Sequence, residues 1–121
     1  MPVLPGADLR FAELAGRWSA DPLPPGTAAE CSVRVVRVPP GPRTPHRHPH
    51  SYEVVYVAQG QGRVWEGDSG YEVVTGDLVL IPPGVAHATV CTGASDLVLV
   101  CFFPHPDLSR NLEELAGPVR T

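Results

Sequence analysis

The chain has 121 residues, of which 43% are hydrophobic and 18% are charged, and its formal net charge is −4. This length supports one domain with its own core, and the composition is that of a globular protein. Because the sequence has no basic patch, we expect neither a nucleic acid nor an anionic membrane as partner. The nine cationic side chains are all arginines, which excludes Schiff-base chemistry and a phosphate-binding lysine.

Cysteine usage bears on the cellular compartment. The three cysteines, Cys31, Cys91 and Cys101, are odd in number and form no C-x-x-C pair. The sequence shows neither a signal-peptide pattern nor an apolar run long enough to cross a membrane. We therefore expect a cytoplasmic protein whose thiols stay reduced.

Residues 1–30 are interpreted as a lead-in segment before the main body of the domain. Asp8 is a candidate N-cap for a short helix that ends at Gly16. Residues 21–26 contain three prolines and are expected to form a connector, because proline fixes φ and removes a backbone donor.

Residues 31–106 contain short apolar, β-branched segments separated by turns rich in glycine and proline. About eight strands at this spacing predict an all-β fold, either a β-barrel or a double-sheet jelly roll. Arg34 and Arg37 have opposite parity, so one of them can reach the interior, where it would need a partner or a substrate anion. The predicted strands cover residues 31–38, 53–57, 63–66, 71–75, 78–81, 87–91 and 97–103.

Residues 107–121 form a tail that is predicted to be helical. Asp107 is its candidate N-cap, Leu108 and Leu112 share one face, and Gly117 is the candidate C-cap. We interpret the three segments as parts of a single domain, with short helices at the two ends of a β-structure.

Three histidines stand at alternate positions in residues 41–60, namely His46, His48 and His50. Alternation is the period of a β-strand, so His46 and His48 would project from one face. With Glu53 close behind, they form most of a divalent-metal site. The proline before His50 interrupts the strand, so this ring is expected beside the ligands or at the rim of the site.

A further candidate ligand comes from residues 76–87. His87 follows a Pro-Pro-Gly turn at residues 82–84. Such a rigid turn holds the next strand in a fixed register, as a preorganised metal ligand requires.

Both histidine-bearing stretches resemble the two motifs of the cupin superfamily. Residues 41–60 are similar to the first motif, glycine, His-x-His, glutamate and glycine, although the gap after the first glycine is one residue shorter than usual. Residues 76–87 are similar to the second motif, and Cys91 stands where the family often has an asparagine. The resemblance spans roughly residues 31–103.

The resemblance implies a cupin-type jelly-roll β-barrel that holds one divalent transition metal through His46, His48, Glu53 and His87. It also implies a small-molecule substrate and a homodimer, because cupins commonly pair through the edge strands of their barrels. Three imidazoles and one carboxylate suit Fe, Mn, Ni or Zn, of which we favour Fe(II). Four protein ligands leave open positions for water, dioxygen or a chelating substrate.

Other residues are weaker candidates for contact with the substrate or with the ligands. Arg63 and Trp65 share a face, so Arg63 becomes a partner for a substrate anion if Trp65 points inward. Parity from His87 places Cys91 in the interior, whereas alternation does not decide between the two adjacent phenylalanines of the last strand. The full set of these candidates is His50, Tyr52, Arg63, Trp65, Cys91 and Phe103.

These observations predict a metal-dependent enzyme that acts on a small oxygen-rich organic molecule. An Fe(II)-type dioxygenase is slightly favoured, with Glu53 as a ligand and possible proton acceptor. The alternatives are a non-redox isomerase, cyclase, lyase or decarboxylase, and a non-catalytic module that binds a metal or a small ligand. A structural zinc site is normally closed and rich in cysteine, which counts against the last of these.

Overall fold

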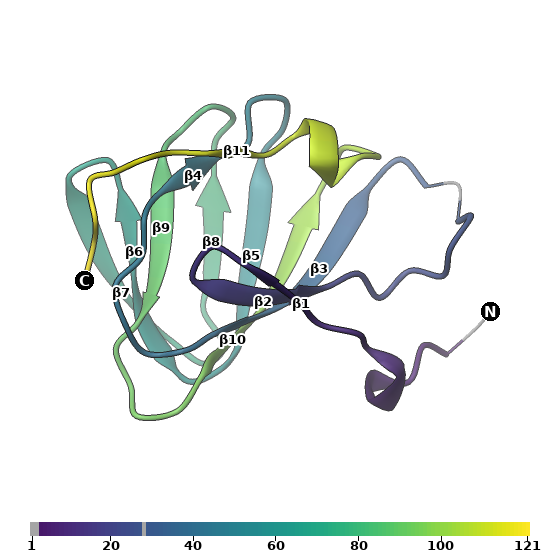
Figure 1. The fold of residues 1–121 in the computed structure, drawn as a ribbon, viewed down its shortest axis with the longest axis horizontal. Coiled ribbons are helices and arrows are strands. Elements are labelled where there is room, and N and C mark those ends of the chain that lie inside the picture. Colours follow the sequence, from purple (N-terminus) through teal and green to yellow (C-terminus); the bar gives the residue numbers. More distant parts are fainter. Residues whose placement is uncertain (1–2, 28) are drawn as a thin grey trace.

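The computed structural model describes residues 3–27 and 29–121, which form two antiparallel β-sheets (Figure 1). One sheet has six strands in the order β1-β2-β3-β10-β5-β8, and the other has five in the order β11-β4-β9-β6-β7. Within the described ranges, no helix is long and apolar enough to cross a membrane.

The six-stranded sheet contains β1 (Ala12–Leu14), β2 (Arg17–Ala20), β3 (Ser32–Val38), β5 (Glu53–Gln59), β8 (Leu78–Ile81) and β10 (Leu97–Phe103). The five-stranded sheet contains β4 (His46–Arg47), β6 (Gln61–Glu66), β7 (Ser69–Val74), β9 (His87–Cys91) and β11 (Glu113–Glu114). Two 3-10 turns, η1 (Gly6–Asp8) and η2 (Leu108–Arg110), lie near the chain ends.

The hydrophobic core lies between the two sheets. Alternate residues of β3, β5 and β10 are buried, as expected for strands with one face in a core. Val36, Val55 and Leu99 from the first sheet join Val64 and Val73 from the second in one buried cluster. The all-β prediction is therefore confirmed as a two-layer arrangement, and the predicted strands at 78–81, 87–91 and 97–103 coincide with β8, β9 and β10.

The expectation of short α-helices at the two ends is not met in the described residues. Instead of a helix up to Gly16, β1 and β2 form a hairpin in which Gly16 turns with φ of +70°. The hairpin continues the sheet because β2 pairs with β3, and this tertiary pairing outweighs a weak local helix preference.

At the other end of the chain only one turn of helix forms. Asp107 caps η2 by accepting a hydrogen bond from the Ser109 amide at 3.0 Å, so the predicted N-cap is in place. The chain then extends, and β11 pairs with the short strand β4, with Glu113 opposite Arg47. Figure 1 shows this yellow segment running across β4 at the top of the molecule. Pairing along β4 replaces the predicted helix.

Candidate metal centre

Four buried side chains meet between the sheets: His46, His48, Glu53 and His87. One potential ligand atom from each lies within 4.8 Å of the others. The fold brings them together because His46 and His87 are opposite each other in the β4–β9 pairing. The Pro-Pro-Gly turn is attached to the same site, since the Gly84 amide donates to the His48 carbonyl at 2.9 Å.

Backbone carbonyls orient two of the histidine rings. The Nδ1 atom of His48 lies 2.8 Å from the Asn111 carbonyl oxygen, and that of His87 lies 2.9 Å from the Val85 carbonyl oxygen. Each contact requires a proton on Nδ1, which turns Nε2 toward the centre of the cluster. This is the arrangement in which metal-binding histidines are usually held.

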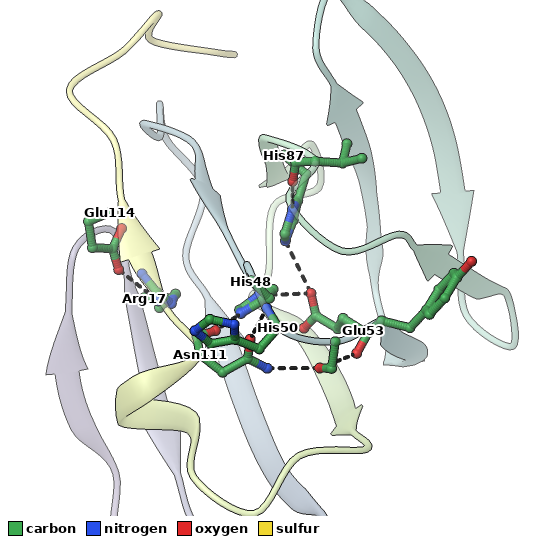
Figure 2. A network of polar contacts seen from close by, with 10 residues as sticks. Arg17, His48, His50, Glu53, His87, Asn111 and Glu114 are labelled. Atoms are coloured by element: carbon green, nitrogen blue, oxygen red, sulfur yellow. Dashed lines mark hydrogen bonds and ion pairs between the residues drawn. The ribbon is translucent and has the colours of Figure 1, made fainter.

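The same geometry tests whether a metal fits. Glu53 Oε1 lies 3.3 Å from His48 Nε2 and 3.1 Å from His87 Nε2 (Figure 2). If both rings are neutral with the proton on Nδ1, two lone pairs face a carboxylate oxygen. Such an arrangement is stable only with extra protons on the rings or with a cation among these atoms. A divalent transition metal satisfies all of these atoms at once, so the donor set fits it.

Burial shapes the electrostatics of the cluster. It lowers the pKa of His46 well below the ordinary value of 6.5, and the neighbouring His87 adds to this effect. Burial alone would raise the pKa of Glu53, but the contacts with His48 and His87 outweigh it and hold this pKa below its ordinary 4.5. At neutral pH His46 is therefore neutral and Glu53 is ionised, which are the forms that bind metals.

A cavity of about 40 Å³ adjoins the cluster. Phe103 forms part of its wall and packs against His48, with the ring centroids 4.6 Å apart. The polar side chains around the cavity include Thr89 and the guanidinium groups of Arg17 and Arg43. The small cavity beside the four donors is thus lined by both apolar and cationic residues.

Two candidates near the ligands do not line this cavity. His50 is exposed and stacks on His105, with a centroid separation of 5.8 Å. Tyr52 is also exposed, and its carbonyl oxygen accepts a hydrogen bond from the buried Ser51 hydroxyl at 2.8 Å. Pro49 interrupts the strand before His50, as the sequence suggested, and the ring turns outward.

Arg63, Trp65 and Cys91 also lie away from the cavity. Arg63 and Trp65 share a face as expected, but both donate hydrogen bonds to the Thr121 carbonyl oxygen, and Arg63 also pairs with Glu72. Cys91 is buried in the hydrophobic core, with its thiol 3.0 Å from the carbonyl oxygen of a residue in the following loop. Of the six weaker candidates, Phe103 alone is among the described residues that line the cavity.

Three residues of this region were not identified from the sequence. Asn111 is fully buried and binds the histidine segment through its carbonyl oxygen and its side chain. Arg17 and Arg43 are buried beside the cavity. Arg34 also lines it whereas Arg37 is exposed, in agreement with their opposite parity. No sequence signal identified Arg17 and Arg43 in advance. Strand parity shows which side chains point inward only within a predicted strand, and these two arginines lie in the segment interpreted as a lead-in and in a predicted turn.

A two-sheet fold around a buried three-histidine, one-glutamate cluster defines a candidate metal-binding β-protein. A family model described as the cupin domain matches residues 34–103. This range is more than half of the chain, and the chain belongs to the cupin domain family. The predicted family membership is thus confirmed.

Two curated proteins are related to this chain. Protein SchB of Streptomyces halstedii is 39% identical over 97 residues, which cover 73% of this chain and 69% of SchB. The uncharacterized protein MJ1618 of Methanocaldococcus jannaschii is 35% identical over 69 residues, and the match covers 55% of each protein. The chain thus spans only about half of MJ1618.

Among solved structures, an oxalate decarboxylase from Lactobacillus farciminis, determined as a formate complex, superposes with a TM-score of 0.75. The two sequences are 26% identical, and the match covers 90% of this chain but 34% of the decarboxylase. The chain therefore corresponds to about one third of that protein.

Proposed function

We propose that the protein is a metal-dependent enzyme that acts on a small oxygen-rich organic molecule. The observation that carries the proposal is the buried cluster of His46, His48, Glu53 and His87 next to a cavity. Once bound, a divalent metal would act as a Lewis acid on a substrate oxygen or, if it is iron, support chemistry with dioxygen. Four protein ligands leave positions open for this purpose.

The residues of the chain would supply the remaining functions. Glu53 is buried against two imidazoles as a metal ligand, and it would take up a proton when it detaches from the metal. Phe103 and Leu99 provide apolar wall around the cavity, which limits the access of water. The histidines hold Glu53 in one orientation, so that a substrate atom meets it in a defined geometry.

Two reaction classes follow from this proposal. The first class is an Fe(II)-dependent dioxygenase. The nitrogen-rich donor set is compatible with Fe(II), and it also suits Mn, Ni and Zn. A non-redox reaction such as decarboxylation or isomerisation is favoured by the likeness to an oxalate decarboxylase crystallised with formate, a small carboxylate. In either class the substrate would bind the metal through oxygen.

Reconstitution tests the proposal and separates the two classes. The protein is purified without metal and loaded separately with Fe(II), Mn(II), Ni(II) and Zn(II). Each form is then assayed for dioxygen uptake and for carbon dioxide release with β-diketones, catechols, thiols and small dicarboxylates. Uptake only with iron supports the dioxygenase, and turnover without uptake supports the non-redox class. Stoichiometric metal binding without turnover of any compound would contradict an enzyme and favour a binding module.

We also propose that the protein forms a homodimer through the outer face of the six-stranded sheet. On this face, two rows of directly opposite residues in β3, β10, β5 and β8 are hydrophobic, and the row beyond them contains Arg37 opposite Val98. A continuous apolar face of this kind is typical of an interaction surface. Its members are Val33, Val35, Val54, Tyr56, Leu78, Leu80, Val100 and Phe102.

A further inference from the structure

Two arginines are buried next to the metal cluster. Arg17 is 7% exposed and Arg43 is 5% exposed, and both line the cavity. Arginine is almost never buried to this extent unless its charge is paired. A guanidinium nitrogen that is buried without a partner in the protein therefore indicates where an anionic ligand can bind.

Both terminal nitrogens of Arg17 have partners in the protein. Its Nη1 donates to the Ala15 carbonyl oxygen at 3.0 Å, and its Nη2 lies 2.9 Å from Glu114 Oε1 (Figure 2). Glu114 comes from β11, so the two ends of the chain meet at this ion pair. The pairing fixes the Arg17 side chain at the edge of the cavity.

Arg43 is only partly engaged. Its Nη1 donates to the Thr89 carbonyl oxygen at 2.7 Å. In the part of the chain that the structure describes, Nε and Nη2 of Arg43 are buried without a hydrogen-bond partner. These two atoms form one edge of the guanidinium group, the edge that binds both oxygens of a carboxylate side by side.

The fold holds Arg43 in place from two directions. Its backbone amide and carbonyl exchange hydrogen bonds with Arg120 at 2.9 and 2.8 Å in an isolated β-bridge, which fixes the backbone from which the side chain extends. Gly16 leaves room for it, because a Cβ atom there would lie 3.1 Å from Arg43 Cγ. Burial, followed by the charge of Arg17, lowers the pKa of Arg43 to about 10, so the side chain remains a cation at neutral pH.

The charges around the cavity are incomplete once a metal is bound. The carboxylates of Glu53 and Glu114 balance the two arginines, and a divalent metal then leaves an excess of positive charge. A buried excess of this kind is unfavourable without an anion. The cavity of about 40 Å³ has room for about three water molecules, so the anion has to be small.

We propose that Arg43, with Arg17 beside it, binds a carboxylate or enolate group of the substrate while the metal binds another oxygen of the same molecule. This inference rests on the proposed metal-dependent function and names its substrate class, a small organic anion. The Nε–Nη2 edge of Arg43 supplies two parallel charge-assisted hydrogen bonds, which select a planar anion over a neutral molecule of the same shape.

Binding of two probes to the zinc-loaded protein tests the inference by calorimetry. Oxalate is the anionic probe, and imidazole is a neutral probe that needs only the metal. Relative to wild type, Arg43→Gln is expected to weaken oxalate binding about tenfold or more and to change imidazole binding less than about twofold. Arg10→Gln is the matched control, because Arg10 is exposed and donates only to nearby carbonyl oxygens; it should change neither.

Further variants and the zinc content separate the possible outcomes. Arg43→Lys keeps the positive charge but loses the pair of parallel N–H donors. The expected oxalate affinity lies between those of the wild type and Arg43→Gln. Arg17→Gln removes the neighbouring cation and should also weaken oxalate. Unchanged oxalate affinity in zinc-loaded Arg43→Gln and Arg43→Lys would overturn the inference and leave the metal site standing. Failure of the wild type to bind zinc or any other divalent metal would instead contradict the proposed function itself.

Discussion

Replacement of Asn111 by alanine tests how the C-terminal segment supports the metal cluster. The Asn111 side chain is fully buried. Its Oδ1 accepts from the His50 amide at 2.8 Å, and its Nδ2 donates to the Ser51 hydroxyl at 2.8 Å. Each lost hydrogen bond costs about 0.5–1.5 kcal/mol, and each buried group left unsatisfied adds to this, so we expect the free energy of unfolding to fall by about 2–4 kcal/mol.

Urea unfolding of the metal-free protein measures this change. Fluorescence of Trp18 and Trp65 reports the transition, and an unchanged slope with a lower midpoint would show that stability alone has changed. Ser109→Ala is a suitable control, because Ser109 is exposed and its hydroxyl donates to Asp107 in the same turn, and the expected loss is below about 0.5 kcal/mol. A loss below about 1 kcal/mol for Asn111→Ala would refute the reasoning, because the two buried bonds would then carry no net stability.

The same variant should also weaken the metal site. The Asn111 carbonyl oxygen holds His48 by its Nδ1 atom, and the carbonyl remains in the variant but loses the side chain that anchors it. Loss of such outer contacts typically lowers metal affinity about 10- to 100-fold, and we expect a value near the lower end, measured by competition with a chromophoric chelator. Unchanged metal affinity would mean that the carbonyl keeps its position without the side chain.

Two further predictions concern acid stability and oligomeric state. The pKa of His46 and that of Glu53 lie below their ordinary values of 6.5 and 4.5, so at these positions the unfolded chain binds protons more readily than the folded one. The melting temperature of the metal-free protein should therefore fall as the pH drops below each ordinary value in turn, and a melting temperature independent of pH would contradict this. A double variant Leu78→Glu and Leu80→Glu should sediment as a folded monomer whereas the wild type sediments as a dimer, and a dimer that persists would exclude the outer face of the six-stranded sheet as the interface.

The strands were predictable wherever an apolar run is bounded by proline or glycine. The strand at residues 97–103 is a clear case, because its alternate residues are buried on one face while β3 and β5 pair with it on its two sides. The cluster of His46, His48, Glu53 and His87 was also predictable, since motif spacing and strand pairing agree in bringing these side chains together.

The rest depended on contacts between distant segments. Nothing local distinguishes the hairpin around Gly16 from a short helix, because its pairing with β3 decides the outcome. Arg17 and Arg43 lie in a lead-in segment and a turn, where no strand parity indicates which side chains point inward. Parity shows that Trp65 and Arg63 share a face of their strand, but it does not show which face points into the core. In the fold, the Trp65 ring donates to the Thr121 carbonyl oxygen.

Metal content after reconstitution is the most direct test of the central claim. Elemental analysis of the wild type, of the double variant His46→Ala and His48→Ala, and of His50→Ala is compared after identical loading and desalting. The account predicts one divalent metal per chain in the wild type and in His50→Ala, and none in the double variant, with β-sheet circular dichroism retained in all three. Full metal content in a folded double variant, or no metal in the wild type, would contradict it.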